Sequence, residues 1–450
     1  MTNMSLFSRM RYRFAILTFG LSCAVPAFAA EEKAAEPQGI VPIPAYGDDI
    51  WSRGNLTGDW GGLRTDWAGK GIQFDVDWVH WIDNAVDGGT SDANEVGGNI
   101  TYNMKLDLMR AGILNLAELQ VRAESRYGNS GILNTGQIVP INTASTTPTN
   151  YTDFDDGYDI ALTQLSLLKL FTPHFGMLVG KLDMFADGDQ NEFATGRGRT
   201  GFNNWSMNYG TGLLLVPAST IGAGVVYLPS PELSISSLLI SGGECVRSDC
   251  FNDLNDKGGI SATAATYQYN LGGLPGGVSG TFLYFFDFDF TDLQSLIPVP
   301  GEGLVGSDES KSWLVTSSFF QYLSADGAQG GPLNLTNRVP DLQGWGIFGR
   351  ITRADDKTNP WKTSVTVGLG GRGVIPKRPN DVFGVGYFYN GLSVDRFDTS
   401  DFEDGEGLEA FYSVAITPAL KFSFNAQWVG KSKPDSDDAT VLTGRFQLVF

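Results

Sequence analysis

The sequence predicts an all-β chain that folds into one transmembrane antiparallel β-barrel, most simply of sixteen strands, after a short helical segment near the N-terminus. Three observations support this prediction. The chain opens with an export signal, apolar and polar residues alternate with period two in many segments of about ten residues, and the last such segment ends on Phe450. No one of the three is decisive, but together they favour a barrel in an outer membrane.

Residues 1–29 have the pattern of an export signal. A region with three arginines precedes an apolar run at 14–25 and a small-x-small cleavage site at 27–29. The apolar run is too short for a membrane-spanning helix, which needs about 20 residues. The mature chain should begin near Ala30, and a lipoprotein site at Cys23 is the weaker alternative. We therefore expect a signal peptide at 1–29, a periplasmic arm at 30–71 and the barrel at 72–450.

Composition narrows the class of protein further. The 57 glycines and 12% aromatic residues fit an all-β protein with many turns. The formal net charge is −19, and it becomes −22 once the three signal arginines are removed. Such a charge excludes nucleic acid as a natural partner. The acidic clusters near 153–156, 401–404 and 435–438 are expected in solvated external loops.

The alternating segments predict sixteen strands, an even number that places both termini on the periplasmic side. Short turns are expected at 110–112, 172–174, 229–231 and 417–419, although strict alternation of sides does not accommodate all of them, and the 323–343 connection is long for a periplasmic turn. The predicted strands lie near 72–82, 99–109, 113–126, 158–171, 176–185, 219–228, 233–241, 259–271, 278–290, 310–322, 344–354, 361–372, 382–390, 408–416, 420–428 and 440–450.

The segment 114–127 carries the most informative polar face. Its alternate positions are apolar, and between them stand five polar residues, Glu118, Gln120, Arg122, Glu124 and Arg126. A solvated ladder on a soluble strand would look the same, but in an exported chain with this many strands a polar pore wall is the better interpretation. Lys181 and Asp183, two residues apart on one predicted strand, should share a face and extend the same constriction.

Two long connections, 127–157 and 186–218, are rich in Gly, Asn, Ser and Thr. Loops of this length are usually functional or disordered. One or both could fold into the barrel and narrow it, or lie outside on its rim. Before the first strand, 55–71 contains a short helical piece that could cap the barrel mouth or serve as an ordinary arm.

Enzymatic chemistry finds little support. His80 falls in the lipid-facing phase and His174 in a turn, so no nucleophile–base pair is evident. No zinc cluster or phosphate-binding glycine motif occurs, and we expect no metal and no cofactor. Cys245 and Cys250 are expected to form a disulfide, because no His or further Cys lies near enough to complete a metal site.

Three tryptophans could stack against a sugar ring or belong to the aromatic girdle of a membrane barrel. The girdle is the favoured interpretation for Trp205 and Trp313. For Trp81 the two interpretations stay open, because it lies in the polar phase of its strand.

Several segments in one order along the chain resemble the carbohydrate-selective porin family, the OprB-type porins. The matching segments are Leu56-Thr57-Gly58-Asp59-Trp60-Gly61-Gly62-Leu63-Arg64, Gly180-Lys181-Leu182-Asp183, Asn191-Glu192-Phe193-Ala194, Gly344-Trp345-Gly346-Ile347-Phe348-Gly349-Arg350, Arg378-Pro379-Asn380-Asp381 with Gly384-Val385-Gly386-Tyr387, and Glu409-Ala410-Phe411-Tyr412 with Thr417-Pro418. The pair Cys245/Cys250 and the acidic loops are departures from what the family leads one to expect.

The resemblance implies a sixteen-stranded outer-membrane barrel that passes glucose or related small carbohydrates by passive diffusion, without catalysis. The expected partners are small sugars, outer-membrane lipid and the barrel-assembly machinery, the last through the strand that ends on Phe450. A homo-oligomer is left open. Two other functions are left open as well, a general or cation-preferring porin and a plugged surface-structural or adhesion barrel.

Overall fold

The computed structural model describes residues 14–15, 24–25, 39–47, 49–90, 94–128, 135–146, 160–185, 191–194, 198–246, 250–251, 257–299, 303–326, 332–333, 340–393, 402–433 and 436–450. The predicted export signal lies almost wholly outside these ranges. Of that segment the structure describes only the paired two-residue strands β1 (Phe14–Ala15) and β2 (Ala24–Val25).

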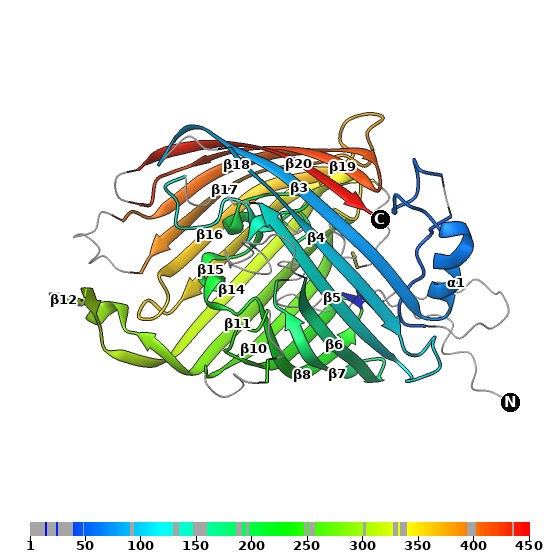
Figure 1. The fold of residues 1–450 in the computed structure, drawn as a ribbon, viewed down its shortest axis with the longest axis horizontal. Helices are drawn as coiled ribbons and strands as arrows, with labels where there is room; N and C mark the ends of the chain where they lie inside the picture. Colours follow the sequence, from blue (N-terminus) through cyan, green and yellow to red (C-terminus); the bar gives the residue numbers. More distant parts are fainter. Residues whose placement is uncertain are drawn as a thin grey trace.

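Sixteen antiparallel strands close into one barrel, in which β20 pairs with β3 (Figure 1). The predicted fold class and strand number are confirmed. The barrel strands are β3 (Ile72–Gly89), β4 (Asn94–Asp107), β5 (Ala117–Gly128), β6 (Ala161–Thr172), β7 (Phe175–Asp183), β8 (Ser219–Ser230), β9 (Leu233–Ser241), β10 (Gly259–Leu271), β11 (Leu274–Thr291), β14 (Asp308–Ala325), β15 (Gly344–Ala354), β16 (Trp361–Arg372), β17 (Val382–Leu392), β18 (Gly405–Thr417), β19 (Leu420–Val429) and β20 (Asp437–Val449).

Each strand runs opposite to its neighbour, so the connections alternate between two ends of the barrel. We call the end that holds Ile72 of β3 and Val449 of β20 the terminus end, and the other the distal end. The four predicted short turns and the connection after β14 all fall at the terminus end, so the expected conflict with strict alternation was wrong. At the distal end, the β11–β14 connection holds η5 (Leu293–Ser295) and a small hairpin of β12 (Ile297–Val299) and β13 (Gly303–Val305).

The outer surface of the barrel is apolar. Large side chains that point outward are about half exposed, among them Leu239, Phe282 and Ile351. Ionisable side chains that point inward are almost inaccessible to solvent, among them Glu118 and Arg445. This arrangement is the reverse of a soluble β-domain and matches the predicted outward placement of the apolar phase.

The inner surface has two unlike parts. On β18, β19, β20, β3, β4 and β5 most of the inward positions carry charged or polar side chains; we call this the polar wall. On β8 to β11 the inward positions are largely apolar, and we call this the apolar wall. Its largest buried side chains are Val226, Leu228, Leu238, Ile240, Ile260, Leu283 and Phe285. The prediction that every strand has one polar face was therefore wrong for β8 to β11, where apolar side chains occupy both faces.

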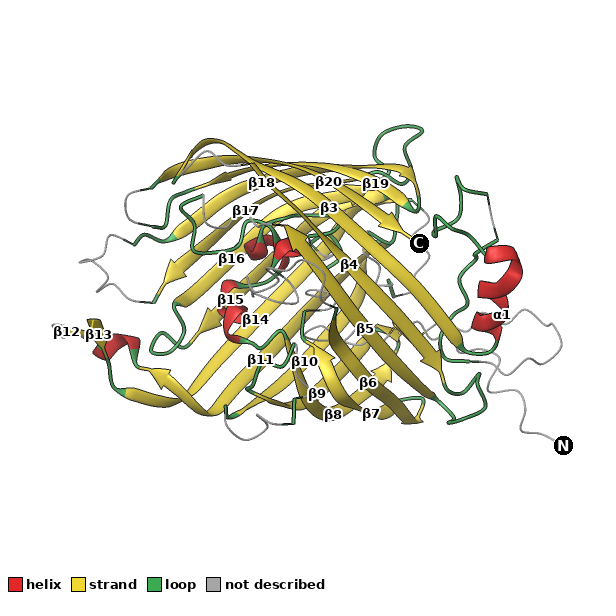
Figure 2. Cartoon of the chain, viewed as in Figure 1, coloured by secondary structure: helices red, strands yellow, loops and turns green. Residues whose placement is uncertain are grey.

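Two connections fold into the barrel, as Figure 2 shows. The β5–β6 connection contributes 135–146 with η3 (Thr143–Ser145), and the β7–β8 connection contributes 198–218 with α2 (Trp205–Asn208) and η4 (Thr211–Leu215). Trp205 and Leu213 pack in one apolar core with side chains of the apolar wall, which explains how that wall stays away from water. Of the two predicted placements, these parts of both connections adopt the inward one.

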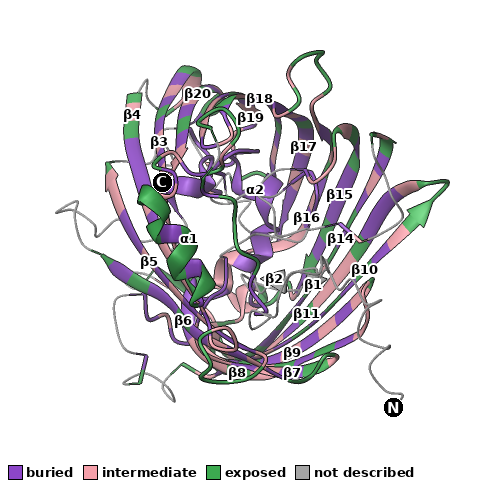
Figure 3. Cartoon of the chain, turned by 90° about the vertical axis from the view of Figure 1, so that its right-hand side faces the viewer, coloured by how far each residue is buried: buried purple, intermediate pink, exposed green. Residues whose placement is uncertain are grey.

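The N-terminal arm lies at the terminus end, where Figures 1 and 3 show α1 (Leu63–Gly69) in front of the barrel opening. The 3₁₀ helix η1 (Trp60–Gly62) precedes α1, and Gly61 and Gly62 have positive φ angles. Arg64 anchors the arm, since its guanidinium donates to the carbonyl oxygen of Phe74 at 2.6 Å and to the carboxylate of Asp75 at 2.7 Å. Among the described helices, none is long and apolar enough to cross a membrane.

Candidate pore constriction

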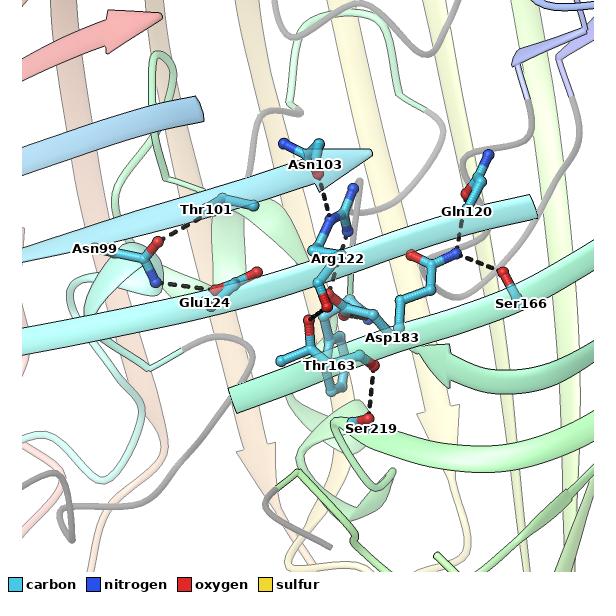
Figure 4. Close-up of polar contacts among 12 residues, drawn as sticks. Asn99, Thr101, Asn103, Gln120, Arg122, Glu124, Thr163, Ser166, Asp183 and Ser219 are labelled. Atoms are coloured by element: carbon cyan, nitrogen blue, oxygen red, sulfur yellow. Dashed lines mark hydrogen bonds and ion pairs between the residues drawn. The ribbon is translucent and has the colours of Figure 1, made fainter. Parts of the chain in front are cut away.

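Arg122 and Asp183 form an ion pair on the inner surface, with 3.2 Å between Nη1 and Oδ2 (Figure 4). Arg122 comes from β5 and Asp183 from the end of β7, two strands away. The Nε of Arg122 also donates to Asn103 Oδ1 on β4 at 2.9 Å, and Asp183 Oδ1 accepts the N–H of Phe185 at 3.1 Å. Arg122 and Asp183 were predicted as pore residues on two separate strands, and the closed barrel places them in contact.

A second group of contacts continues the polar surface toward the terminus end. Gln120 donates to Glu118 at 3.0 Å, and Gln164 on β6 donates to Gln120 at 2.9 Å and to Ser166 at 2.9 Å. These side chains face one another because their strands pair in register and all occupy the inward phase (Figure 4). The predicted ladder on β5 is thus part of a wider hydrogen-bonded surface over β5 and β6.

Nearer the distal end, Glu124 and Arg126 contact the neighbouring strand β4 and a segment that folds inward. Glu124 accepts from Asn99 Nδ2 at 3.0 Å, and Asn99 in turn accepts from Arg199 of the β7–β8 connection at 2.6 Å. Arg126 donates to the carbonyl oxygen of Ser145 in the β5–β6 connection. The part of the predicted ladder nearer the distal end therefore contacts the segments that fold inward.

Lys181 contacts the β9–β10 connection. Its ammonium donates to the carbonyl oxygens of Cys245 at 2.6 Å and Val246 at 3.3 Å, in the β9–β10 connection, while Asp183 turns to Arg122. The register pairs Lys181 with Leu165, whose side chain is exposed on the outer phase. The hydrogen bonds of Lys181 lead to the β9–β10 connection and those of Asp183 lead to Arg122 and Phe185, so a constriction that includes Lys181 stays a prediction.

The Cys245 and Cys250 sulfur atoms are bonded in the structure. The small loop they close is held against β8, since Cys245 N–H donates to Ser219 O at 2.9 Å and Glu244 accepts the N–H of Ala218 at 2.9 Å. Burial raises the pKa of Glu244 to about 7, although two backbone N–H donors oppose the rise. No group of His, Cys, Asp and Glu that could hold a metal occurs among the described residues.

The three candidate tryptophans occupy different environments. Trp205 is fully buried in α2, with its ring 5.1 Å from Phe185 and 4.7 Å from Tyr209, so its assignment to a membrane girdle was wrong. Trp81 is buried on the inner side against Ala144. Trp313 is 37% exposed on the outer surface, as a girdle residue should be. The difference arises because the β7–β8 connection enters the barrel instead of lying on its rim.

Glu409 and Arg445 are two inward charges that contact the inner segments and that were not among the predicted site residues. A signal was present, because β18 to β20 show the same alternating polar positions that singled out β5. Those positions are Glu409, Ser413, Ser423, Asn425, Gln427, Thr443, Arg445 and Gln447.

Comparisons with known proteins give one consistent picture. Residues 93–450 match the model of the carbohydrate-selective porin, OprB family. The chain is similar to the high-pH structure of Pseudomonas putida OprB, with TM-score 0.71 and 18% identity over 89% of this chain and 99% of that one. The low-pH structure of the same protein gives TM-score 0.55 and 17% identity over the same shares. No curated protein matches the sequence.

The structural likeness shows the fold, and the family match covers well over half of the chain. Family and fold are those of a passive channel and not of an enzyme. Members of this group are outer-membrane β-barrels. The chain belongs to the OprB family of carbohydrate-selective porins.

Proposed function

We propose that this porin passes small, neutral, glucose-like monosaccharides passively across the outer membrane. In this proposal the export signal is cleaved, the terminus end faces the periplasm and the outer surface contacts lipid. The strand that ends on Phe450 would engage the barrel-assembly machinery. The observation that supports the proposal best is the polar wall, on which charges of both signs point inward along neighbouring strands.

The chemistry of this wall suits a polyhydroxylated solute. In this proposal Arg122 supplies guanidinium donors, and carboxylate acceptors come from Glu118 and Glu124 of the wall and from Asp183 of β7 beside it. Sugar hydroxyls can then replace the hydrogen bonds that they lose to water. Because Arg122 and Asp183 are paired, the two opposite charges produce little net field for one type of ion. Binding must remain weak, since a tight site would stop flux.

Single-channel recording in planar bilayers tests the proposal. Current that decreases as glucose is added supports it. Arg122→Ala and Glu124→Ala should each change this glucose effect while the barrel still assembles, because each removes a charged partner from the polar wall. Arg353→Ala serves as the matched control, because Arg353 is exposed and contacts Thr363 on the outer side. An unchanged glucose effect in both test variants would remove these residues from the constriction.

The same recordings, together with liposome swelling, distinguish the proposed function from the two alternatives. Marked cation selectivity with no effect of glucose would favour a general or cation-preferring porin, which the −22 charge of the mature chain makes reasonable. A plugged barrel is favoured by one observation, namely that two connections enter the barrel. Liposomes that contain the protein and do not swell in monosaccharide solutions would support it.

The orientation of the barrel has its own test. Lys431 lies at the distal end, and Lys70 lies in the arm at the terminus end. The two variants for the test are Lys431→Cys and Lys70→Cys. A membrane-impermeant maleimide added to intact cells should label the first variant and leave the second unlabelled. The reverse pattern would show that the termini face outward.

A further inference from the structure

The two inward-folded segments are bonded into one unit, which we call the inner loop unit (135–146 and 198–216). Thr143 N–H donates to Asn203 O at 2.7 Å, and Trp205 N–H donates to Pro140 O at 2.9 Å. Asn208 Nδ2 also donates to Thr143 Oγ1 at 3.0 Å. The two segments should therefore move together.

One side of the inner loop unit is held by apolar contact. Trp205, Tyr209, Leu213 and Val216 share a core with Leu238, Ile260 and other side chains of the apolar wall. Apolar contact stabilises without strong directional preference, so it tolerates sliding and rotation better than hydrogen bonds do. Contact with the apolar wall alone therefore does not fix the position of the inner loop unit in the barrel.

The polar contacts on the other side include those of two buried charges of the polar wall. The Glu409 carboxylate accepts the N–H groups of Asn203 and of Asn204, the latter at 3.0 Å. The Arg445 guanidinium donates to Gly201 O at 2.7 Å and also to Gly198 O and Asn203 Oδ1. Their exposed fractions are 1% for Glu409 and 0% for Arg445.

A neutral pair beside these charges adds a third attachment. Asn204 Nδ2 donates to Gln427 Oε1 at 3.1 Å, and Gln427 Nε2 donates to Ile141 O at 3.0 Å. Gln427 thus contacts both segments of the inner loop unit. Charge-assisted hydrogen bonds to backbone groups are short and directional, and they fix the position of the chain that supplies those groups.

We propose that Glu409 and Arg445 are positioning residues that hold the inner loop unit against the polar wall and so set the cross-section and sugar preference of the channel. This inference rests on the proposed sugar channel for the sugar preference, but not for the cross-section. Removal of either residue should loosen the unit where it meets β18 to β20, while the apolar wall still holds the opposite side.

The test is single-channel recording of Glu409→Ala in KCl, with and without glucose. Two charge-assisted hydrogen bonds are lost, so the ratio of docked to released unit should fall on the order of a hundredfold. We expect a larger and noisier KCl conductance and a weaker effect of glucose. Glu409→Gln retains one acceptor oxygen and should lie between the wild type and Glu409→Ala. Arg445→Ala should change conductance in the same direction.

Glu406→Ala is the matched control, because Glu406 lies on the same strand, points outward and accepts Tyr387 OH at 2.5 Å. It should conduct like the wild type. If Glu409→Ala does not assemble, Glu409→Gln carries the test. Wild-type conductance and noise in an assembled Glu409 variant, or an equal change in Glu406→Ala, would overturn the inference. A wild-type channel that ignores glucose would overturn the proposed function alone, since the KCl conductance would still report on Glu409.

Discussion

The polar and apolar walls of the barrel hold the same inner loop unit by different physics. On the polar wall, Glu409 and Arg445 bind particular backbone groups, so the contact has a direction and a register. On the apolar wall, side chains such as Leu238 and Leu283 stabilise the unit through area removed from water. The comparison indicates that the apolar wall supplies much of the stability of the unit, whereas the polar wall supplies its position.

The largest expected effect comes from placing a charge in the apolar wall. Leu238→Glu would bury an ionised group without a partner, which should cost about 3 kcal/mol or more. The yield of folded, heat-modifiable protein and the midpoint of thermal unfolding measure the effect. Asn103→Asp is the control on the polar wall, because Oδ1 of Asn103 already accepts from the Nε of Arg122 at 2.9 Å. Equal losses in the two variants would contradict the distinction between the walls.

Removing the centre of the apolar contact should have the next largest effect. Trp205→Ala would leave a cavity between Phe185 and Tyr209, at a cost of about 3–5 kcal/mol as for other large-to-small core substitutions. Thermal unfolding is the measurement, and Trp313→Ala on the outer surface is the control with a smaller effect. If the two tryptophan variants unfold alike, α2 does not stabilise the barrel as its packing suggests.

A buried acid beside the inner segments should make stability depend on pH. Burial raises the pKa of Glu192 to about 8, although Tyr322 OH and the N–H of Asp341 donate to its carboxylate and lower the pKa. The ordinary value is 4.5, so the folded protein binds the proton more tightly than the unfolded chain does. This contribution to stability is complete below pH 4.5 and is lost as the pH rises to about 8, with an upper limit of about 5 kcal/mol.

Glu192→Gln removes this dependence, because the amide oxygen can accept both hydrogen bonds and carries no proton. The difference between the unfolding midpoints of the wild type and the variant should grow in favour of the variant as the pH rises from 4.5 to 8. Other buried acids titrate in both proteins, so only this difference is informative. A constant difference would show that Glu192 does not titrate in this range.

The smallest expected effect concerns the disulfide beside the apolar wall. Replacing Cys245 and Cys250 by Ser opens a short loop, which in the chain-entropy model costs about 2 kcal/mol. The thermal midpoint of the double variant should match that of the wild type treated with reductant. If the double variant also loses its glucose effect, the loop takes part in the channel as well as in stability.

Much of the fold could be predicted because it depends on local pattern. Period two places side chains on opposite faces of a strand, and an even number of strands returns the chain to its starting end. Most of the sixteen strands follow from that pattern, and so does the inward position of Arg122. The ladder on β5 was visible because its charges recur at every second residue.

The rest of the site depends on pairing between distant segments. Arg122 meets Asp183 only after β5, β6 and β7 have paired, and no spacing in the sequence reveals that contact. The assignment of Trp205 failed for a related reason, because a loop that enters the barrel places its tryptophan in an interior core rather than at the membrane. Strands β8 to β11 show little alternation of polar and apolar residues. This lack of alternation is the feature of the sequence that indicates an inward-folded loop against these strands.

Local sequence pattern defines which residues form strands, which side of most strands is apolar and which family the chain resembles, because strand geometry depends on neighbouring residues. The position of the inner loop unit and the charges that hold it depend on contacts that exist in the closed barrel. Those contacts join residues more than 200 positions apart, as between Asn204 and Glu409. Most of the partners of Glu409 and Arg445 in the unit are backbone groups, which every residue carries, so no side-chain pattern predicts them.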